Sequence, residues 1–163
     1  MRYAVIICLC LTACSSALAG ETTAQIKRGE YMATVGACAD CHTPGAMLGK
    51  PDPSRLMAGS EVGFEMPGMG VFHPPNLTPD PETGLGNWTN QEIVAAIRTG
   101  VRPDGRTLVP IMPWHFYAVL TDEDAQAIAT YLRSLPPIKN KVPGPFGPNE
   151  KPTSFVDKVV PPN

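Results

Sequence analysis

The chain has 163 residues, and its 13 basic and 15 acidic side chains give a formal net charge of −2. This length is typical of one domain with a core of its own, although 19 prolines and 15 glycines indicate that much of the chain forms loops. The near balance of charge argues against a nucleic-acid partner, which would require a basic stripe.

Residues 1–19 have the pattern of an export signal. A basic residue precedes an apolar run, and small residues follow as far as Ala17-Leu18-Ala19, where cleavage is predicted. The apolar run is shorter than the roughly 20 residues that span a bilayer. A second cut stays open, because Leu11-Thr12-Ala13-Cys14 resembles a lipobox in which Cys14 would carry a lipid anchor. Either cut predicts export from the cytoplasm.

Residues Thr23 to Ala37 are predicted to form the first helix. A glycine inside a helix costs about 1 kcal/mol relative to alanine. Gly29 is therefore best explained by another helix that crosses closely there. The predicted apolar stripe of this helix consists of Ile26, Met32 and Val35, with Tyr31 beside them.

Cys38-Ala39-Asp40-Cys41-His42 follows directly and has the attachment pattern of c-type haem. Two thiols at this spacing can add to the two vinyl groups of a porphyrin, and the imidazole of His42 can then bind the iron. Two other interpretations are weaker. A thioredoxin-like thiol pair needs alternating strands and helices. A zinc site needs four ligands, which would be Cys38 and Cys41 with two of His42, His73 and His115.

Residues Thr43 to Asn87 show no clear helix or strand pattern, because prolines and glycines interrupt them. So long a loop counts against a compact domain unless a function orders it. Wrapping a haem is such a function. The methionines of this loop are interpreted as core or rim contacts: Met47, Met57, Met66 and Met69.

Thr89-Asn90-Gln91-Glu92 is a capping box that begins a second helix, which Gly100 ends. Its predicted apolar face consists of Ile93, Val94 and Ile97. Pro103-Asp104-Gly105 then predicts a turn. The arginines around this turn are either solvated or partners of haem propionates: Arg98, Arg102 and Arg106.

Two prolines stiffen the loop Pro110-Ile111-Met112-Pro113. The last helix is predicted to begin at Thr121, with acidic residues in its first turn, and to end before Pro136-Pro137. Residues 138–163 are rich in proline and predicted to be extended, either as a loosely packed tail or as a segment that wraps the domain or docks a partner. The apolar face of the last helix is predicted to contain Ala125, Ile128, Ala129, Leu132 and Tyr131.

The order of these features resembles a class I cytochrome c. Residues 76–89, with the sequence NLTPDPETGLGNWT, look like a signature of cytochrome c subunits and domains that serve membrane-bound and periplasmic dehydrogenases. The resemblance covers residues 27–137. Further segments similar to that group are Gly100–Arg106, Met112-Pro113, Leu120–Asp124 and Tyr131–Pro136.

The resemblance implies an all-α class I cytochrome c fold, with the first and last helices crossing near Gly29 and Tyr131 and a long loop wrapped around one covalent haem c. It divides the chain into a signal peptide (1–19), a cytochrome c domain (20–137) and a Pro-rich C-terminal tail (138–163).

The resemblance also implies a site. Cys38 and Cys41 would hold the haem, His42 would be the proximal ligand of the iron and Met112 the distal ligand. His115 and His73 stay open as alternatives to Met112. Asn76 and Trp88 would lie near the propionates.

Histidine and methionine together close both axial positions, and the thioether raises the reduction potential. The expected function is a non-enzymatic, periplasmic one-electron carrier. It would take electrons from a dehydrogenase and pass them to an oxidase or another component of the respiratory chain. The subunits that it resembles often carry three haem domains, whereas this chain has one CxxCH and no internal repeat.

Two alternatives to a free carrier stay open. The chain could be a haem-bearing subunit of a dehydrogenase complex. It could also be a haem enzyme with an open iron, which would require that Met112 does not bind.

Overall fold

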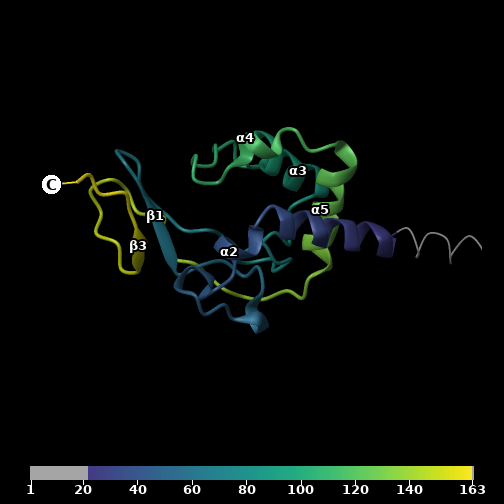
Figure 1. Cartoon of the computed structure of the whole chain (residues 1–163), viewed down its shortest axis with the longest axis horizontal. Helices are drawn as coiled ribbons and strands as arrows, with labels where there is room; N and C mark the ends of the chain where they lie inside the picture. Colours follow the sequence, from purple (N-terminus) through teal and green to yellow (C-terminus); the bar gives the residue numbers. More distant parts are fainter. Residues whose placement is uncertain (1–21, 163) are drawn as a thin grey trace, which may run out of the picture.

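A computed structural model gives the structure of residues 22–162, shown in Figure 1. The predicted export signal and the alternative lipobox at Cys14 lie outside these residues. Within the described part of the chain, no helix has the length and apolarity needed to cross a membrane. Residues 22–35 are helical. The further helices are α2 (Cys38–His42), α3 (Asn90–Thr99), α4 (Trp114–Tyr117) and α5 (Asp122–Ser134), with 3₁₀ turns η1 (Ala46–Leu48) and η2 (Pro53–Arg55).

The helix of residues 22–35 crosses α5 at Gly29, as the sequence predicts. A Cβ atom placed on Gly29 would lie 2.0 Å from the carbonyl oxygen of Ala127 and 2.7 Å from Cβ of Tyr131. Ala33, four residues later on the same face, is 1% exposed. Small residues at these two positions therefore let the two backbones approach each other.

The predicted apolar stripe of this helix is wrong at two positions. Val35 is 64% exposed and Tyr31 is 58% exposed. The buried line runs through Gly29 and Ala33 instead, because backbone contact with α5 selects the smallest side chains rather than the most apolar ones. The helix also ends at residue 35, before a turn at Gly36 and Ala37.

The α3 and α5 helices begin where the sequence predicts them. Thr89 and Glu92 form both hydrogen bonds of the capping box, and Gly100 ends α3 with φ of 72°. The Thr121 side chain accepts a hydrogen bond from the amide of Asp124 at the start of α5. The core between these helices includes Met57, Leu85, Ile93, Ile128 and Leu132.

A small sheet corrects the all-α prediction and the expectation that residues 43–87 lack regular structure. Strands β1 (Val62–Met66) and β2 (Gly70–Phe72) form an antiparallel hairpin. Strand β3 (Phe155–Asp157) pairs parallel to β1, which gives the order β2-β1-β3. The sheet lies at the end of the molecule away from α5 (Figure 1).

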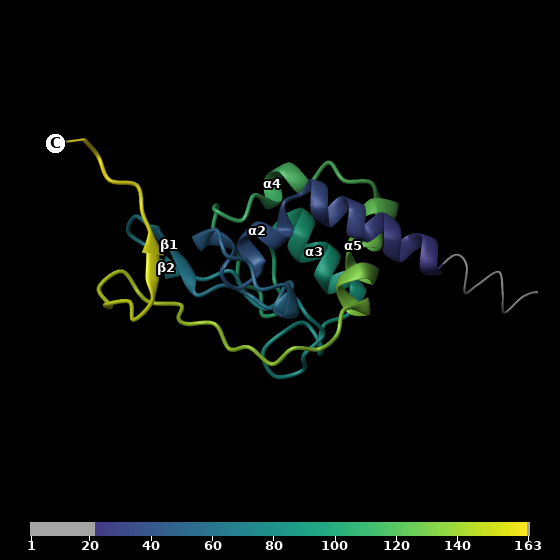
Figure 2. The same cartoon turned by 60° about the horizontal axis from the view of Figure 1, so that its bottom comes forward.

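Residues 138–162 run from the end of α5 along the loop of residues 43–87 to the sheet, as Figure 2 shows. Ile138 and Asn140 hydrogen-bond with this loop. Farther along, Phe146 exchanges two backbone hydrogen bonds with Val71, and β3 joins the sheet. These contacts correspond to the alternative in which the C-terminal segment wraps the domain. The boundaries 1–19, 20–137 and 138–163 stay predictions.

Candidate functional site

The residues of the CxxCH motif form the short helix α2. Ala37 precedes it in the left-handed conformation, with φ of 53°, which separates α2 from the helix before it. Cys38 and Cys41 are three residues apart, so their side chains lie on the same face. Both are free thiols and partly buried. The motif therefore presents two unpaired sulfur atoms on one side of α2.

The electrostatics of the two thiols do not support a redox pair. Burial raises the pKa of Cys38 to about 11, and burial also raises the pKa of Cys41. Redox-active pairs depend instead on a lowered thiol pKa. In addition, residues 22–162 show no alternation of strands and helices of the thioredoxin kind. The thioredoxin-like interpretation is therefore wrong.

His42 is buried, and its ring orientation is fixed by one hydrogen bond. Its Nδ1 lies 2.8 Å from the carbonyl oxygen of Pro75. Because a carbonyl only accepts, Nδ1 carries the hydrogen and Nε2 keeps its lone pair. Burial lowers the pKa of His42, which favours the neutral ring that binds metals. Metal-binding histidines commonly donate their second N–H to a backbone carbonyl in this way, so His42 fits an axial ligand of haem iron.

Met112 lies in a tight loop that leads into α4. Its N–H donates to the carbonyl of Val109 (3.0 Å), and its own carbonyl accepts from the N–H of Trp114 (2.8 Å). Tyr117 of α4 then donates its hydroxyl hydrogen to the carbonyl of Gly36 (2.7 Å), two residues before Cys38. The segment that carries Met112 is thus tied to the start of the CxxCH motif. Coordination by Met112 stays a prediction.

The two other histidines, His73 and His115, contact residues outside the CxxCH motif. His73 Nε2 is 2.7 Å from Ser154 Oγ, and its ring meets the ring of Phe146 edge-on at 5.9 Å. His115 is exposed and its ring lies 4.3 Å from that of Phe116. Among residues 22–162 no group of three or more His, Cys, Asp or Glu side chains could hold a metal ion. The zinc interpretation is therefore wrong.

Acidification is expected to weaken the attachment of the C-terminal segment at His73. Burial lowers the pKa of His73 below its ordinary value of about 6.5, and Nδ1 is buried without a partner. The unfolded chain then binds more protons than the folded chain in the window between the lowered pKa and about 6.5, so stability falls as pH drops through this window.

We expect the free energy of unfolding to fall more steeply from pH 7 to pH 5 in the native protein than in His73→Gln. His115→Gln, a change at an exposed histidine, serves as the control and should keep the native slope. Denaturant unfolding at each pH measures the three slopes. A native slope in His73→Gln would contradict this assignment.

The predicted propionate neighbours have other contacts as well. Asn76 is 1% exposed, and its amide nitrogen donates to Thr83 Oγ1 (3.0 Å) and to the carbonyl of Ile138 (2.7 Å). The Trp88 ring packs on the core and lies 5.2 Å from the guanidinium carbon of Arg102. The propionate roles of Asn76 and Trp88 stay predictions.

The arginines near the turn at residues 103–105 are engaged unequally. Arg98 is paired with Asp122, and Arg102 with Asp104 at 3.4 Å. Arg106 is exposed. Pairing of these side chains with propionates stays a prediction.

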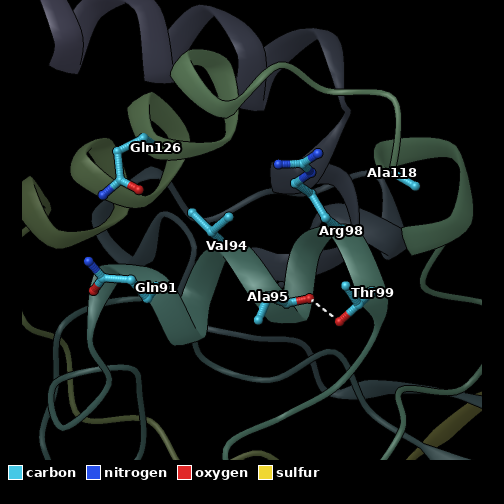
Figure 3. A pocket seen from close by; sticks show the side chains of 7 residues that line it. All are labelled: Gln91, Val94, Ala95, Arg98, Thr99, Ala118 and Gln126. Carbon is cyan, nitrogen blue, oxygen red and sulfur yellow. Dashed lines mark hydrogen bonds between the residues drawn. The ribbon is translucent and has the colours of Figure 1, made fainter.

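A cavity of about 400 Å³ lies beside α3, between it and the start of α5 (Figure 3). None of its lining residues belongs to the CxxCH motif or to the Met112 loop. The cavity is therefore separate from the candidate site. Its lining consists of Gln91, Val94, Ala95, Arg98, Thr99, Ala118 and Gln126.

Sequence reasoning missed two groups of the site. Pro75 acts through its backbone carbonyl, 33 residues from His42, so its side chain gives no sign of the contact. The Tyr117 hydroxyl reaches Gly36 across 81 residues. No local pattern in the sequence indicates either contact.

Comparison with known proteins gives a family match over most of the chain. The family model described as cytochrome c matches residues 26–136. The chain is 39% identical over 123 residues to the cytochrome c subunit of alcohol dehydrogenase (quinone) from Gluconobacter oxydans (strain 621H). The aligned segment covers 74% of this chain and 24% of that protein.

Two further curated relatives carry similar names. The gluconate 2-dehydrogenase cytochrome c subunit of Pantoea cypripedii is 37% identical over 108 residues, 66% of this chain and 22% of the relative. The fructose dehydrogenase cytochrome subunit of Gluconobacter japonicus is 35% identical over 128 residues, 75% of this chain and 25% of the relative. The chain thus spans about a quarter of the length of these relatives.

Proposed function

The chain belongs to the cytochrome c family, and from this premise we propose that it is a periplasmic one-electron carrier that holds a single haem c. Family membership supports covalent haem and electron transport. The single CxxCH in the sequence supports the count of one haem. The observation that carries the proposal is the buried neutral His42, whose Nδ1–H donates to Pro75 and leaves Nε2 for iron.

We assign the site residues as follows. Cys38 and Cys41 would hold the haem through two thioethers, and His42 and Met112 would bind its iron. When bound, the haem supplies a one-electron ferric/ferrous couple. The carbonyl of Pro75 accepts the Nδ1 hydrogen of His42 and so fixes the tautomer of the ring. The Tyr117 hydroxyl donates to the carbonyl of Gly36 and so connects α4, which follows the Met112 loop, to the start of the motif. Two protein ligands would leave no open position on the iron for a substrate, which is the behaviour of an electron-transfer protein rather than of an enzyme.

The proposed electron donor is a periplasmic or membrane-bound dehydrogenase. Its support is the names of the relatives, which are cytochrome subunits of alcohol, gluconate and fructose dehydrogenases. The proposed acceptor is an oxidase or another respiratory-chain component. A haem-bearing subunit of a dehydrogenase complex is the alternative that the same names favour. Migration as a monomer on native gels of cell extract supports the carrier, and comigration with a dehydrogenase supports the subunit.

The visible spectrum of the exported protein tests the site. The native protein should show a c-type spectrum with a methionine-to-iron charge-transfer band, and its reduced form should not respond to carbon monoxide. In Met112→Ala the band should vanish, carbon monoxide should bind, and the reduction potential should fall because the thioether is lost.

Met69→Ala is the matched control, because Met69 is 50% exposed in the turn of the hairpin. It should keep the native spectrum. A charge-transfer band that survives in Met112→Ala would show another distal ligand. Rapid carbon monoxide binding by the native protein would favour the open-site haem enzyme.

A further inference from the structure

Two segments of the long loop hold His42 from two sides. The N–H of Gly59 donates to the carbonyl of His42 (2.8 Å), and the carbonyl of Pro75 accepts from His42 Nδ1 (2.8 Å). These two contacts fix the backbone and the ring of the same residue.

The two segments are also paired with each other. The N–H of Leu77 donates to the carbonyl of Met57 (2.8 Å), and the N–H of Ser60 donates to the carbonyl of Pro74 (3.1 Å). Residues 57–60 and 74–77 therefore act as one support for His42. A displacement of either segment would also move the backbone or the ring of His42.

The C-terminal segment contacts both halves of this support. Asn140 Nδ2 donates to the carbonyl of Ala58 (2.7 Å), and Asn76 Nδ2 donates to the carbonyl of Ile138 (2.7 Å). Val142 fills the space at Gly59, where an added Cβ would lie 2.5 Å from Val142 Cγ1. Residues 138–142 thus join segments 57–60 and 74–77 from the far side.

The side-chain hydrogen bond of Asn140 ends on the carbonyl of a buried residue. Ala58 is fully buried, so its carbonyl depends on a protein donor. The backbone N–H of Asn140 also donates to Thr83 Oγ1 (3.0 Å), which anchors the residue itself. The match to the cytochrome c family ends at residue 136, so this brace is supplied by a part of the chain beyond the match.

We propose that residues 138–142 brace the support of the proximal histidine and that Asn140 is a positioning residue for His42. The inference rests on the proposed attachment of haem at Cys38, Cys41 and His42. The hydrogen bond at Nδ1 sets the basicity of an axial imidazole, and ligand basicity and outer hydrogen bonds set the reduction potential. The brace therefore acts on the potential without touching the iron.

The test compares Asn140→Ala with Asn149→Ala in the full-length protein carrying haem. Asn149 is an exposed asparagine farther along the same segment, so the control makes the same chemical change without loss of the brace. Amide and ring N–H exchange in the reduced protein is followed by NMR. In Asn140→Ala the Gly59 N–H and the His42 Nδ1–H should exchange roughly fivefold faster, as expected for the loss of one hydrogen bond.

The reduction potential is the second measurement, because a merely stabilising contact would leave it unchanged. It should rise in Asn140→Ala, since a looser Nδ1 hydrogen bond makes His42 a weaker donor to ferric iron. It should stay native in Asn149→Ala. If Asn140→Ala does not accumulate, Val142→Ala replaces it, because that change removes side-chain packing on Gly59 and no hydrogen bond.

Exchange rates and potentials that are equal in Asn140→Ala and Asn149→Ala would overturn the brace, with haem attachment left intact. Absence of a c-type spectrum in the native protein would overturn the proposed attachment itself. The two failures are therefore distinguishable from one set of samples.

Discussion

Replacing Gly29 with alanine is expected to lower the free energy of unfolding by about 3 kcal/mol. The new methyl group would lie 2.0 Å from the carbonyl oxygen and 2.5 Å from the carbonyl carbon of Ala127. Backbone atoms of α5 cannot move aside as a flexible side chain can, so the two helices must separate. The better helix propensity of alanine, worth about 1 kcal/mol, offsets only part of this cost. Urea unfolding of the protein carrying haem measures the change.

Gly147→Ala is the control for this prediction. A Cβ atom there would come no closer than 3.6 Å to another heavy atom, a side-chain oxygen of Glu150. We expect a change within about 0.5 kcal/mol, as for surface substitutions in general. If Gly29→Ala proves as stable as Gly147→Ala, the first helix and α5 do not cross as closely as the structure shows.

The helices could be predicted because their signals are local. Thr89 and Glu92 form their capping box within four residues, and Thr121 caps α5 over the same distance. Gly29 indicated the crossing because a glycine inside a helix needs a reason. The exposed positions of Tyr31 and Val35 could not be predicted in this way, since apolar type alone does not say which face meets α5.

The sheet escaped prediction for two different reasons. The hairpin has a local signal, because Pro67-Gly68 lies between two apolar runs, but glycines and prolines in such number are equally typical of a loop. β3 had none, since Val62 of β1 pairs with Phe155, 93 positions later. Pairing over that distance depends on the whole fold, and the sequence of a three-residue strand does not specify it.

The candidate site likewise contains residues that have a local sequence signal and residues that have none. Cys38, Cys41 and His42 could be predicted as haem-binding residues because haem attachment requires them at fixed spacing. Their supports could not, because Pro75 and Gly59 contribute backbone atoms and Asn140 reaches Ala58 across 82 residues. The residues that tune a site are thus less visible in a sequence than the residues that form it.

Asn76→Ala is expected to lower the free energy of unfolding by about 4 kcal/mol, at the upper end for a single substitution. The side chain is 1% exposed, and besides its two donated bonds its Oδ1 accepts from the N–H of Thr78 (2.9 Å) and from Thr78 Oγ1 (2.8 Å). Its removal leaves the buried N–H of Thr78 without its acceptor. It also takes from the carbonyl of Ile138 the shorter of its two hydrogen bonds, so that only the bond from Thr78 Oγ1 at 3.3 Å is left. Denaturant unfolding of the protein carrying haem measures the loss.

Asn87→Ala is the control that distinguishes loss of the Asn76 hydrogen bonds from a general effect of substitution in this loop. Asn87 belongs to the same signature segment, but it is exposed and makes one side-chain hydrogen bond, to the carbonyl of Pro81 (2.8 Å). Its replacement should cost about 0.5 kcal/mol, because water can satisfy the freed carbonyl. Equal losses in the two variants would contradict the network. A large loss in Asn76→Ala alone would show that this asparagine joins the loop of residues 76–83 to the C-terminal segment, whatever it contributes to a propionate.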